Sequence, residues 1–122
     1  MEVNYDDLHF TECSILKWAM TDENTLTLKV SKLSMVKSNG NVNTFEKCLL
    51  TFYSILKCTI SVKGYKENSL DLNTNPPYVI SILNGECLMD SQLYFVEGVD
   101  VVLNSWTEWD ICGSKFTLEV LD

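Results

Sequence analysis

The sequence predicts an all-β protein, a single-domain antiparallel β-sandwich or barrel over residues 1–122 with at most one short helix. The first observation is composition, because one Ala and one Gln stand against ten Thr, eleven Ser and thirteen aromatic residues. Strands favour Thr and aromatic residues, whereas helices are built from Ala, Leu, Glu, Gln and Lys. The second is apolar residues at every second position, and the third is short turn signals between these segments. A chain of 122 residues has the length of one domain.

Four strands are indicated by their hydrophobic pattern. The earliest surrounds Ile15 and reaches Trp18, and the sequence leaves open whether it continues from residues 8–10. The other three have apolar residues at alternate positions: Leu26, Leu28 and Val30; Leu56, Cys58, Ile60 and Val62; Phe116, Leu118 and Val120. After Val30 the apolar positions shift to Leu33 and Met35, which predicts a β-bulge near residues 31–32. The side chains expected to be buried are Leu28, Val30, Cys58, Ile60, Val62, Trp109, Phe116, Leu118 and Val120.

Residues 44–56 are consistent with two structures. Apolar residues at Phe45, Cys48 and Phe52 form a helical stripe, and Thr44 is a suitable N-cap. Apolar residues also occupy the opposite face of that helix, and the aromatic and Thr content favours a strand. A strand is the preferred interpretation, with one short helix as the alternative.

Turn signals separate the predicted strands. A hairpin loop is expected at Thr21–Asn24, and longer polar loops are expected at Lys37–Thr44 and Asn68–Pro77. Asn84-Gly85 predicts a tight hairpin between strands at 78–83 and 86–89. Gly113-Ser114 predicts a second hairpin, between strands at 106–112 and 115–121.

The five cysteines stand at positions 13, 48, 58, 87 and 112. Their number is odd, and no C-x-x-C pair or secretion signal accompanies them. Free thiols in a reducing cytoplasm fit this pattern best, so all five are expected to be reduced. One His and no ligand pairs argue against zinc. His9 lies near Asp6, Asp7 and Glu12, but no second catalytic group accompanies it, so a solvent-facing histidine is expected.

The charge of the chain restricts its partners. Nine Lys, no Arg and seventeen Asp plus Glu give a net charge of −8. Such a field repels nucleic acid and anionic membranes, and the Arg fork that reads phosphate or guanine is absent. No apolar run approaches the length of a membrane span or a signal peptide. We therefore expect a cytoplasmic protein without nucleic-acid or membrane partners, whose charged partner is a basic protein.

The densest candidate site is Trp106-Thr107-Glu108-Trp109-Asp110. In a strand, Trp106, Glu108 and Asp110 share one face, while Thr107 and Trp109 share the other. An aromatic side chain beside two carboxylates is typical of a docking point for a basic partner or of a sugar platform. The simpler alternative is that Trp109 faces the core and the acids only keep the outer face wet.

The sequence does not define a function. No catalytic residue, metal site or cofactor motif is predicted. The first hypothesis is a small, non-catalytic binding protein, in its most concrete form an acidic inhibitor or immunity-type protein that acts on a basic partner through Trp106, Glu108 and Asp110. The competing hypothesis is a sugar-binding module or small β-fold enzyme that uses these three residues and Trp109.

Overall fold

The computed structural model describes residues 4–21, 23–63, 65–66, 69–70 and 78–121, and it confirms the all-β prediction. One 3-10 turn, η1 (Tyr5–Asp7), precedes the strands. The strands are β1 (Leu8–His9), β2 (Ser14–Met20), β3 (Leu26–Val36), β4 (Val42–Tyr53), β5 (Lys57–Val62), β6 (Tyr65–Lys66), β7 (Ser69–Leu70), β8 (Tyr78–Asn84), β9 (Gln92–Asp100), β10 (Ser105–Gly113) and β11 (Lys115–Val120). Most of the predicted loop 68–77 lies outside the described residues.

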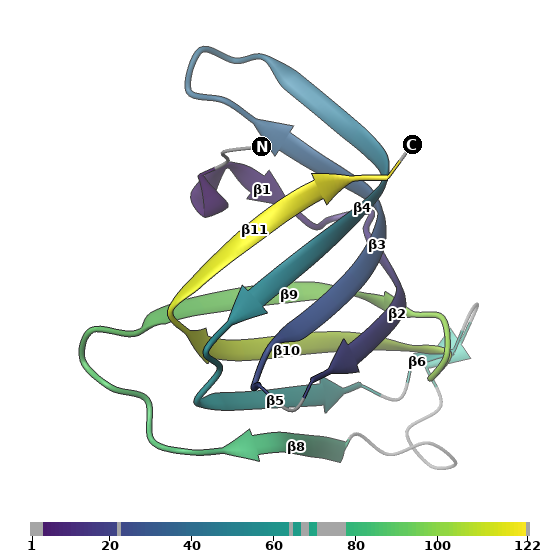
Figure 1. The fold of residues 1–122 in the computed structure, drawn as a ribbon. Coiled ribbons are helices and arrows are strands. Elements are labelled where there is room, and N and C mark those ends of the chain that lie inside the picture. The colour runs from purple at the N-terminus through teal and green to yellow at the C-terminus, as the bar shows by residue number, and fades with distance from the viewer. Residues whose placement is uncertain (1–3, 22, 64, 67–68, 71–77, 122) are drawn as a thin grey trace.

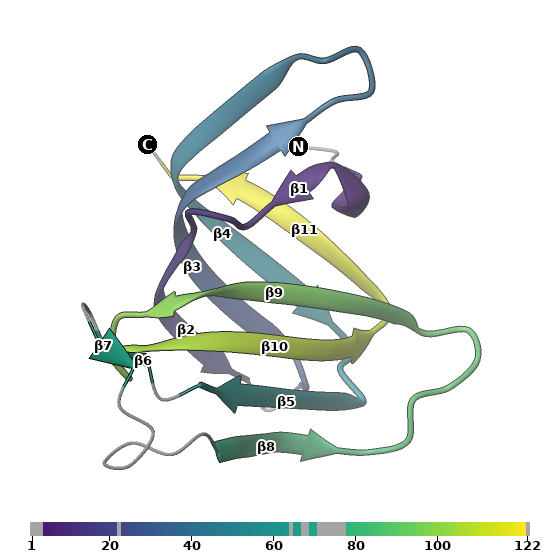
Figure 2. The same ribbon diagram turned by 180° about the vertical axis from the view of Figure 1, so that it is seen from behind.

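The main sheet has the strand order β11-β4-β3-β2-β9-β10-β5-β8, and β1 pairs with β3 beside this path. Its first half, β11 to β2, crosses the second half, β9 to β8, at an oblique angle, as Figures 1 and 2 show from opposite sides. Neighbouring strands are antiparallel except at the junction, where β2 and β9 pair in parallel over two residue pairs. The sheet therefore folds back at this short junction, and its two halves face each other.

The N-terminal segment closes the junction between the halves. The chain after β1 passes so close to β9 that a Cβ on Gly98 would lie 2.5 Å from the carbonyl oxygen of Cys13. The Tyr5 hydroxyl hydrogen-bonds to both the amide and the carbonyl group of Phe95 on the free edge of β9. Tyr5 thus provides hydrogen-bond partners for backbone groups of Phe95 that β2 does not reach.

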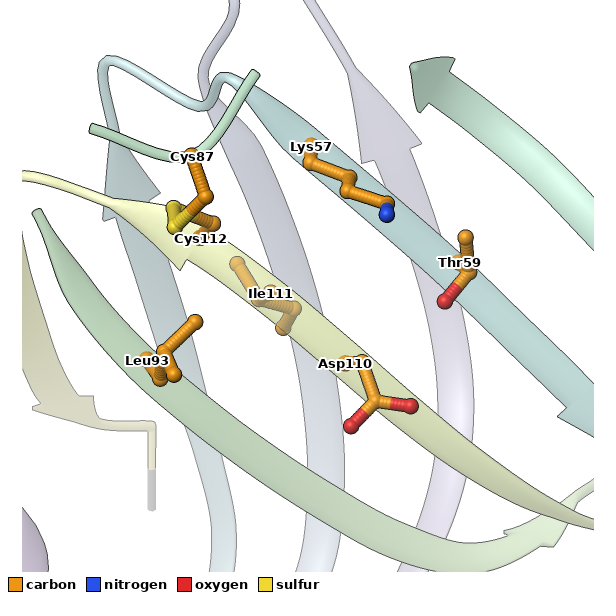
Figure 3. Close-up of a pocket in the computed structure, with 7 residues that line it drawn as sticks. All are labelled: Lys57, Thr59, Cys87, Leu93, Asp110, Ile111 and Cys112. Carbon is orange, nitrogen blue, oxygen red and sulfur yellow. A yellow bond between two sulfur atoms is a disulfide. The ribbon is translucent and has the colours of Figure 1, made fainter. Parts of the chain in front are cut away.

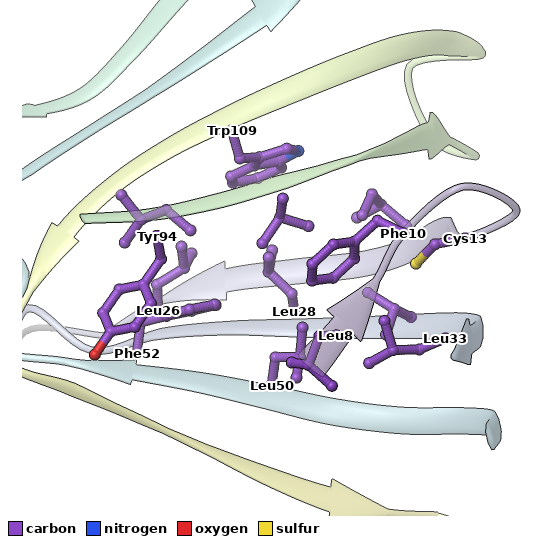
Figure 4. Close-up of a cluster of buried hydrophobic side chains, with 14 of the residues drawn as sticks. Leu8, Phe10, Cys13, Leu26, Leu28, Leu33, Leu50, Phe52, Tyr94 and Trp109 are labelled. Carbon is purple, nitrogen blue, oxygen red and sulfur yellow. The ribbon is translucent and has the colours of Figure 1, made fainter. Parts of the chain in front are cut away.

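One hydrophobic core fills the space between the halves. Figure 4 shows Trp109 and Tyr94 from the second half opposite Leu26, Leu28 and Phe52 from the first. Of the side chains expected to be buried, Leu28, Val30, Cys58, Ile60, Val62, Trp109 and Leu118 are buried. Phe116 and Val120 are only half-buried, because β11 lies at an end of the sheet, although both pack against the core.

The shift of buried positions expected after Val30 is present, but the register between β3 and β4 continues unchanged there, and the nearest register shift lies on β2, between Ile15 and Lys17. Buried side chains occupy even positions of β3 up to Val30 and odd positions from Leu33. Lys32 between them has a φ of 57°, in the left-handed region. The earliest predicted strand does not continue from residues 8–10. β1 is a separate strand that pairs with the C-terminal end of β3, whereas β2 pairs with its N-terminal part.

Residues 44–56 form a strand, as preferred from the sequence, up to Tyr53 at the end of β4. Ser54, with a φ of 52°, then ends the strand and turns the chain toward β5. The hairpin loop at 21–24 is confirmed by the pairing of Met20 with Leu26. The loop predicted at 37–44 is shorter than expected, because β4 already begins at Val42.

Both glycine-based hairpin predictions were wrong. β10 and β11 flank Gly113-Ser114 but pair with different strands, β10 with β5 and β9, and β11 with β4. The backbone amide and the hydroxyl group of Ser114 both donate to the Tyr53 carbonyl, which directs the chain into the other half of the sheet.

The Asn84-Gly85 pair likewise ends β8 without a hairpin, since β8 pairs with β5 and no strand forms at 86–89. Gly85 is needed there for a close approach, because a Cβ would lie 2.4 Å from the Leu56 carbonyl oxygen, to which its amide donates.

The prediction that all five cysteines are reduced was also wrong. Cys87, in the loop between β8 and β9, forms a disulfide with Cys112 at the end of β10. The Cα atoms are 6.0 Å apart, and the residues are 25 positions apart in the sequence. Spacing along the chain cannot reveal such a pair, because a loop folding onto the sheet brings the residues together. Cys13, Cys48 and Cys58 keep their thiols and are buried, as expected for Cys58.

No helix in the described part of the chain is long and apolar enough to cross a membrane.

Candidate functional site

The outward face of β9 and β10 holds the predicted site residues. Along β10, Thr107, Trp109 and Ile111 are buried between the halves. Trp106 and Glu108 are half-buried on the opposite face, and Asp110 is exposed there. The structure therefore brings the three predicted binding residues to one face and turns Trp109 to the other. The four-residue cluster of the sugar-binding hypothesis does not come together.

Strand register adds β9 residues to this face. Asp110 lies opposite Phe95, Glu108 opposite Glu97, and Trp106 opposite Val99. Directly opposite residues of an antiparallel pair share one face and approach within about 5.5 Å at Cβ. We call the set Leu93, Phe95, Glu97, Trp106, Glu108 and Asp110 the β9–β10 face. It combines three carboxylates with exposed apolar side chains, since Leu93 is 75% and Phe95 42% exposed.

One cation compensates part of this charge. The Lys63 ammonium lies 3.6 Å from a carboxylate oxygen of Glu108, and both side chains are open to solvent. An exposed ion pair of this kind contributes little, typically about 0–1 kcal/mol. This ion pair involves Glu108, so Glu97 and Asp110 still bring negative charge to the face.

A pocket of about 290 Å³ lies at one end of the β9–β10 face, beside the disulfide (Figure 3). Its lining comes from three strands and one loop: Lys57, Thr59, Cys87, Leu93, Asp110, Ile111 and Cys112. Cys87 is exposed and forms one wall, while Cys112 is buried. The disulfide thus fixes the loop that bounds this pocket, and Asp110 places a carboxylate at its rim.

A second hollow of about 320 Å³ lies on the other side of Phe95, under the N-terminal segment. Its lining includes Asp6, His9 and Glu97. Burial raises the pKa of Tyr5, which also lines it, to about 12, so this hydroxyl stays protonated as a donor. His9 is exposed, as predicted.

The described residues do not assemble a metal-binding group. No group of three or more His, Cys, Asp or Glu side chains in the described ranges could hold a metal ion. Burial raises the pKa of the Cys13 and Cys58 thiols to about 12, so neither forms the nucleophilic thiolate at neutral pH. What the arrangement offers chemically is a charged and apolar contact surface with two shallow hollows.

Sequence reasoning missed the half of this face that β9 supplies. Leu93 to Val96 are four consecutive apolar residues, so alternation does not reveal a strand there. Two of them, Leu93 and Phe95, are apolar on the exposed side, where a polar residue normally marks the outer face. An uninterrupted apolar run bounded by turn residues was the available signal for this strand.

No protein family, characterised protein or solved structure matches the chain at a significant level.

Proposed function

We propose that this chain is a non-catalytic binding protein that docks a basic protein partner on the β9–β10 face. The observation that carries the proposal is the cross-strand pair Glu97–Glu108, which lies beside Asp110 and next to the exposed side chains of Phe95 and Leu93. Like charges directly opposite each other destabilise a sheet. A cationic partner would remove that cost, and the apolar side chains beside the acids supply contact area that is desolvated on binding.

The charge of the whole chain supports the same partner. A net charge of −8 accelerates the encounter with a basic protein and repels an acidic one. The half-buried Trp106 provides an aromatic anchor beside the acids, as is common at interface hot spots. In its most specific form, the protein is a stoichiometric inhibitor, such as an immunity-type protein that neutralises a basic toxin.

The proposal is tested with two charge-matched double variants. Glu108→Lys with Asp110→Lys reverses charge on the β9–β10 face, whereas Glu46→Lys with Glu119→Lys makes the same charge change on exposed positions of β4 and β11. Binding partners are first crosslinked in extracts of the cells that make the protein, identified by mass spectrometry and purified. Affinity is then measured by calorimetry over a salt series.

We expect a basic partner that binds with one-to-one stoichiometry and loses affinity as salt is raised, because screening acts over about 8 Å at physiological ionic strength. The β9–β10 variant should bind about tenfold more weakly or worse, and the control variant should bind nearly as the wild type does. An acidic partner, or equal losses in both variants, would overturn the proposal.

A further inference from the structure

The two ends of the main sheet differ in how they are protected against pairing with another chain. β11 ends one side and exposes Lys115 and Glu119. β8 ends the other side, and its seven residues, YVISILN, carry no charge. Charged side chains are a common protection of edge strands, and β8 lacks it.

The free side of β8 offers both backbone and apolar contacts. β8 pairs with β5 over six residue pairs, and no described strand pairs with its other side. Every second backbone amide and carbonyl of the strand is therefore directed away from the sheet. Val79 is 65% exposed and Tyr78 is 50% exposed. The pairing with β5 shifts register between Cys58 and Thr59, so the edge is irregular near Ile82, whereas residues 78–81 pair regularly. An uncharged, partly apolar edge of this kind is a template for an added strand.

We propose that β8 pairs antiparallel with β8 of a second copy of this chain, so that two sheets join across a two-fold axis. A strand that pairs with this edge must offer free backbone groups and should carry no charge. β8 of a second copy meets both conditions. A two-fold contact uses the same strand in both copies and leaves neither β8 edge free. The opposite end of the sheet, β11, is protected by charge, so the assembly closes as a dimer.

Two copies of a chain with a net charge of −8 repel each other, and contact through the β8 edge is the least affected by this repulsion. β8 is uncharged, and the neighbouring strand β5 begins at Lys57 and is followed by Lys63. Val62 pairs with Tyr78, so Lys63 lies near the Tyr78 end of β8. Antiparallel pairing brings the Asn84 end of the other copy, followed by Glu86, toward this lysine. Lys63 also lies 3.6 Å from Glu108 of its own chain, so it is shared between the two contacts, but this margin still carries lysines beside an uncharged strand while the chain as a whole is acidic.

The dimer is independent of the proposed binding function. β5 separates β8 from β10 in the sheet, so edge pairing leaves the β9–β10 face open. Either proposal can fail while the other holds, because one depends on backbone pairing at an edge and the other on charge and apolar contacts of a face.

A matched pair of valine substitutions tests the dimer. Val79→Lys places a charge on the exposed side of β8, and Val42→Lys makes the same change on β4, where the valine is 59% exposed. When Tyr78 lies opposite Asn84 of the other copy, Ser81 lies opposite its own copy at the two-fold axis. Two lysines at position 81 therefore repel each other directly, and lysines at position 79 add charge to an edge that is otherwise uncharged. Ser81→Lys, also at an exposed position of β8, serves as a second edge variant.

Sedimentation equilibrium of the oxidised protein gives the monomer–dimer constant. We expect the wild type and Val42→Lys to approach twice 13.9 kDa at high concentration. Val79→Lys and Ser81→Lys should dissociate about tenfold more readily while keeping the circular dichroism of the wild type. A wild type that stays monomeric, one that forms open-ended polymers, or a dimer that both edge variants leave unchanged would overturn the proposal.

Discussion

The two faces of the β9–β10 pair are built from alternate residues of the same two strands, yet they differ in burial, hydrogen bonding and charge. On the inner face, Trp109 is fully buried and its indole N–H donates to Thr107 Oγ1 at 3.1 Å. Thr107 Oγ1 in turn donates to the Gly98 carbonyl at 3.0 Å. Each polar atom in this chain of contacts has a partner, as a stable core requires. The outer face instead sets Glu97 against Glu108 and exposes Phe95.

The difference indicates which positions the fold constrains. The inner side chains specify the packing of the two halves, and their removal leaves cavities or unsatisfied groups. The outer side chains are held less tightly by packing, and Glu97 and Glu108 set two like charges opposite each other. If this face docks a basic partner, as proposed above, that contact is relieved on binding.

The inner face itself contains one acid. Asp100 is 1% exposed and accepts a hydrogen bond from the Leu103 amide at 2.9 Å. Its second carboxylate oxygen, Oδ2, is buried and has no hydrogen-bond partner among the described residues. The two faces thus hold acids for different reasons, since Asp100 shapes the turn between β9 and β10 while Glu97 meets solvent.

Truncating one tryptophan on each face gives the largest expected contrast. Trp109→Ala should cost about 3–5 kcal/mol of the free energy of unfolding, because it leaves a cavity and removes a ring contact with Trp18 at 5.4 Å. This is a large part of the usual total of about 5–15 kcal/mol. Trp106→Ala should lower it far less and should weaken partner binding. Thermal melting of both variants measures the contrast, and equal destabilisation would mean that Trp106 belongs to the core.

Removing the disulfide is expected to have the next largest effect. Cys87→Ser opens a cross-link between residues 25 positions apart, for which the chain-entropy relation gives about 3.5 kcal/mol. Cys87 is exposed, so the serine itself adds no burial cost. Urea unfolding should show the loss, and a reductant should lower the stability of the wild type without affecting the variant. A native wild-type mass without the deficit of about two daltons that accompanies a disulfide would contradict the cross-link.

Neutralising the inner acid is expected to stabilise the protein at neutral pH. Burial raises the pKa of Asp100 above 3.8, so the folded state holds this proton more tightly than the unfolded state does. The free energy of unfolding therefore falls as pH rises from the ordinary value through the raised one. Asp100→Asn removes this dependence and should gain about 1 kcal/mol at neutral pH, while its Oδ1 still accepts from Leu103. A stability difference that stays constant from acid to neutral pH would refute this assignment.

The inner face was the part that the sequence predicted well. Where polar and apolar residues alternate, as in β3, β5 and β10, one buried face follows from the period of two. The same alternation placed Trp106, Glu108 and Asp110 together, because a strand leaves only two directions for a side chain.

The pairing of strands could not be predicted in the same way. Gly113-Ser114 has the composition of a hairpin turn, but Ser114 hydrogen-bonds to the Tyr53 carbonyl, and β11 pairs with β4 in the other half of the sheet. Gly85 and Cys87 likewise take their roles from residues distant in the sequence, Leu56 and Cys112. Turn signals report local backbone conformation, whereas the partner of a strand depends on contacts made across the whole fold.

The smallest expected effect concerns the acid pair of the outer face. Glu97→Gln keeps the shape of the side chain and removes one of two like charges, so it should raise the free energy of unfolding by about 0.2–1 kcal/mol. Screening by salt should reduce this gain, because both carboxylates are in contact with solvent. Glu119→Gln is the control, since Glu119 lies opposite Leu49 and has no acid across the strand. Urea unfolding in low and high salt measures both variants. If Glu97→Gln stabilises the fold and also weakens the basic partner, the pair is kept for binding at the expense of stability. If it stabilises nothing, Lys63 already neutralises the pair, and the strongest support for a binding role of this face is lost.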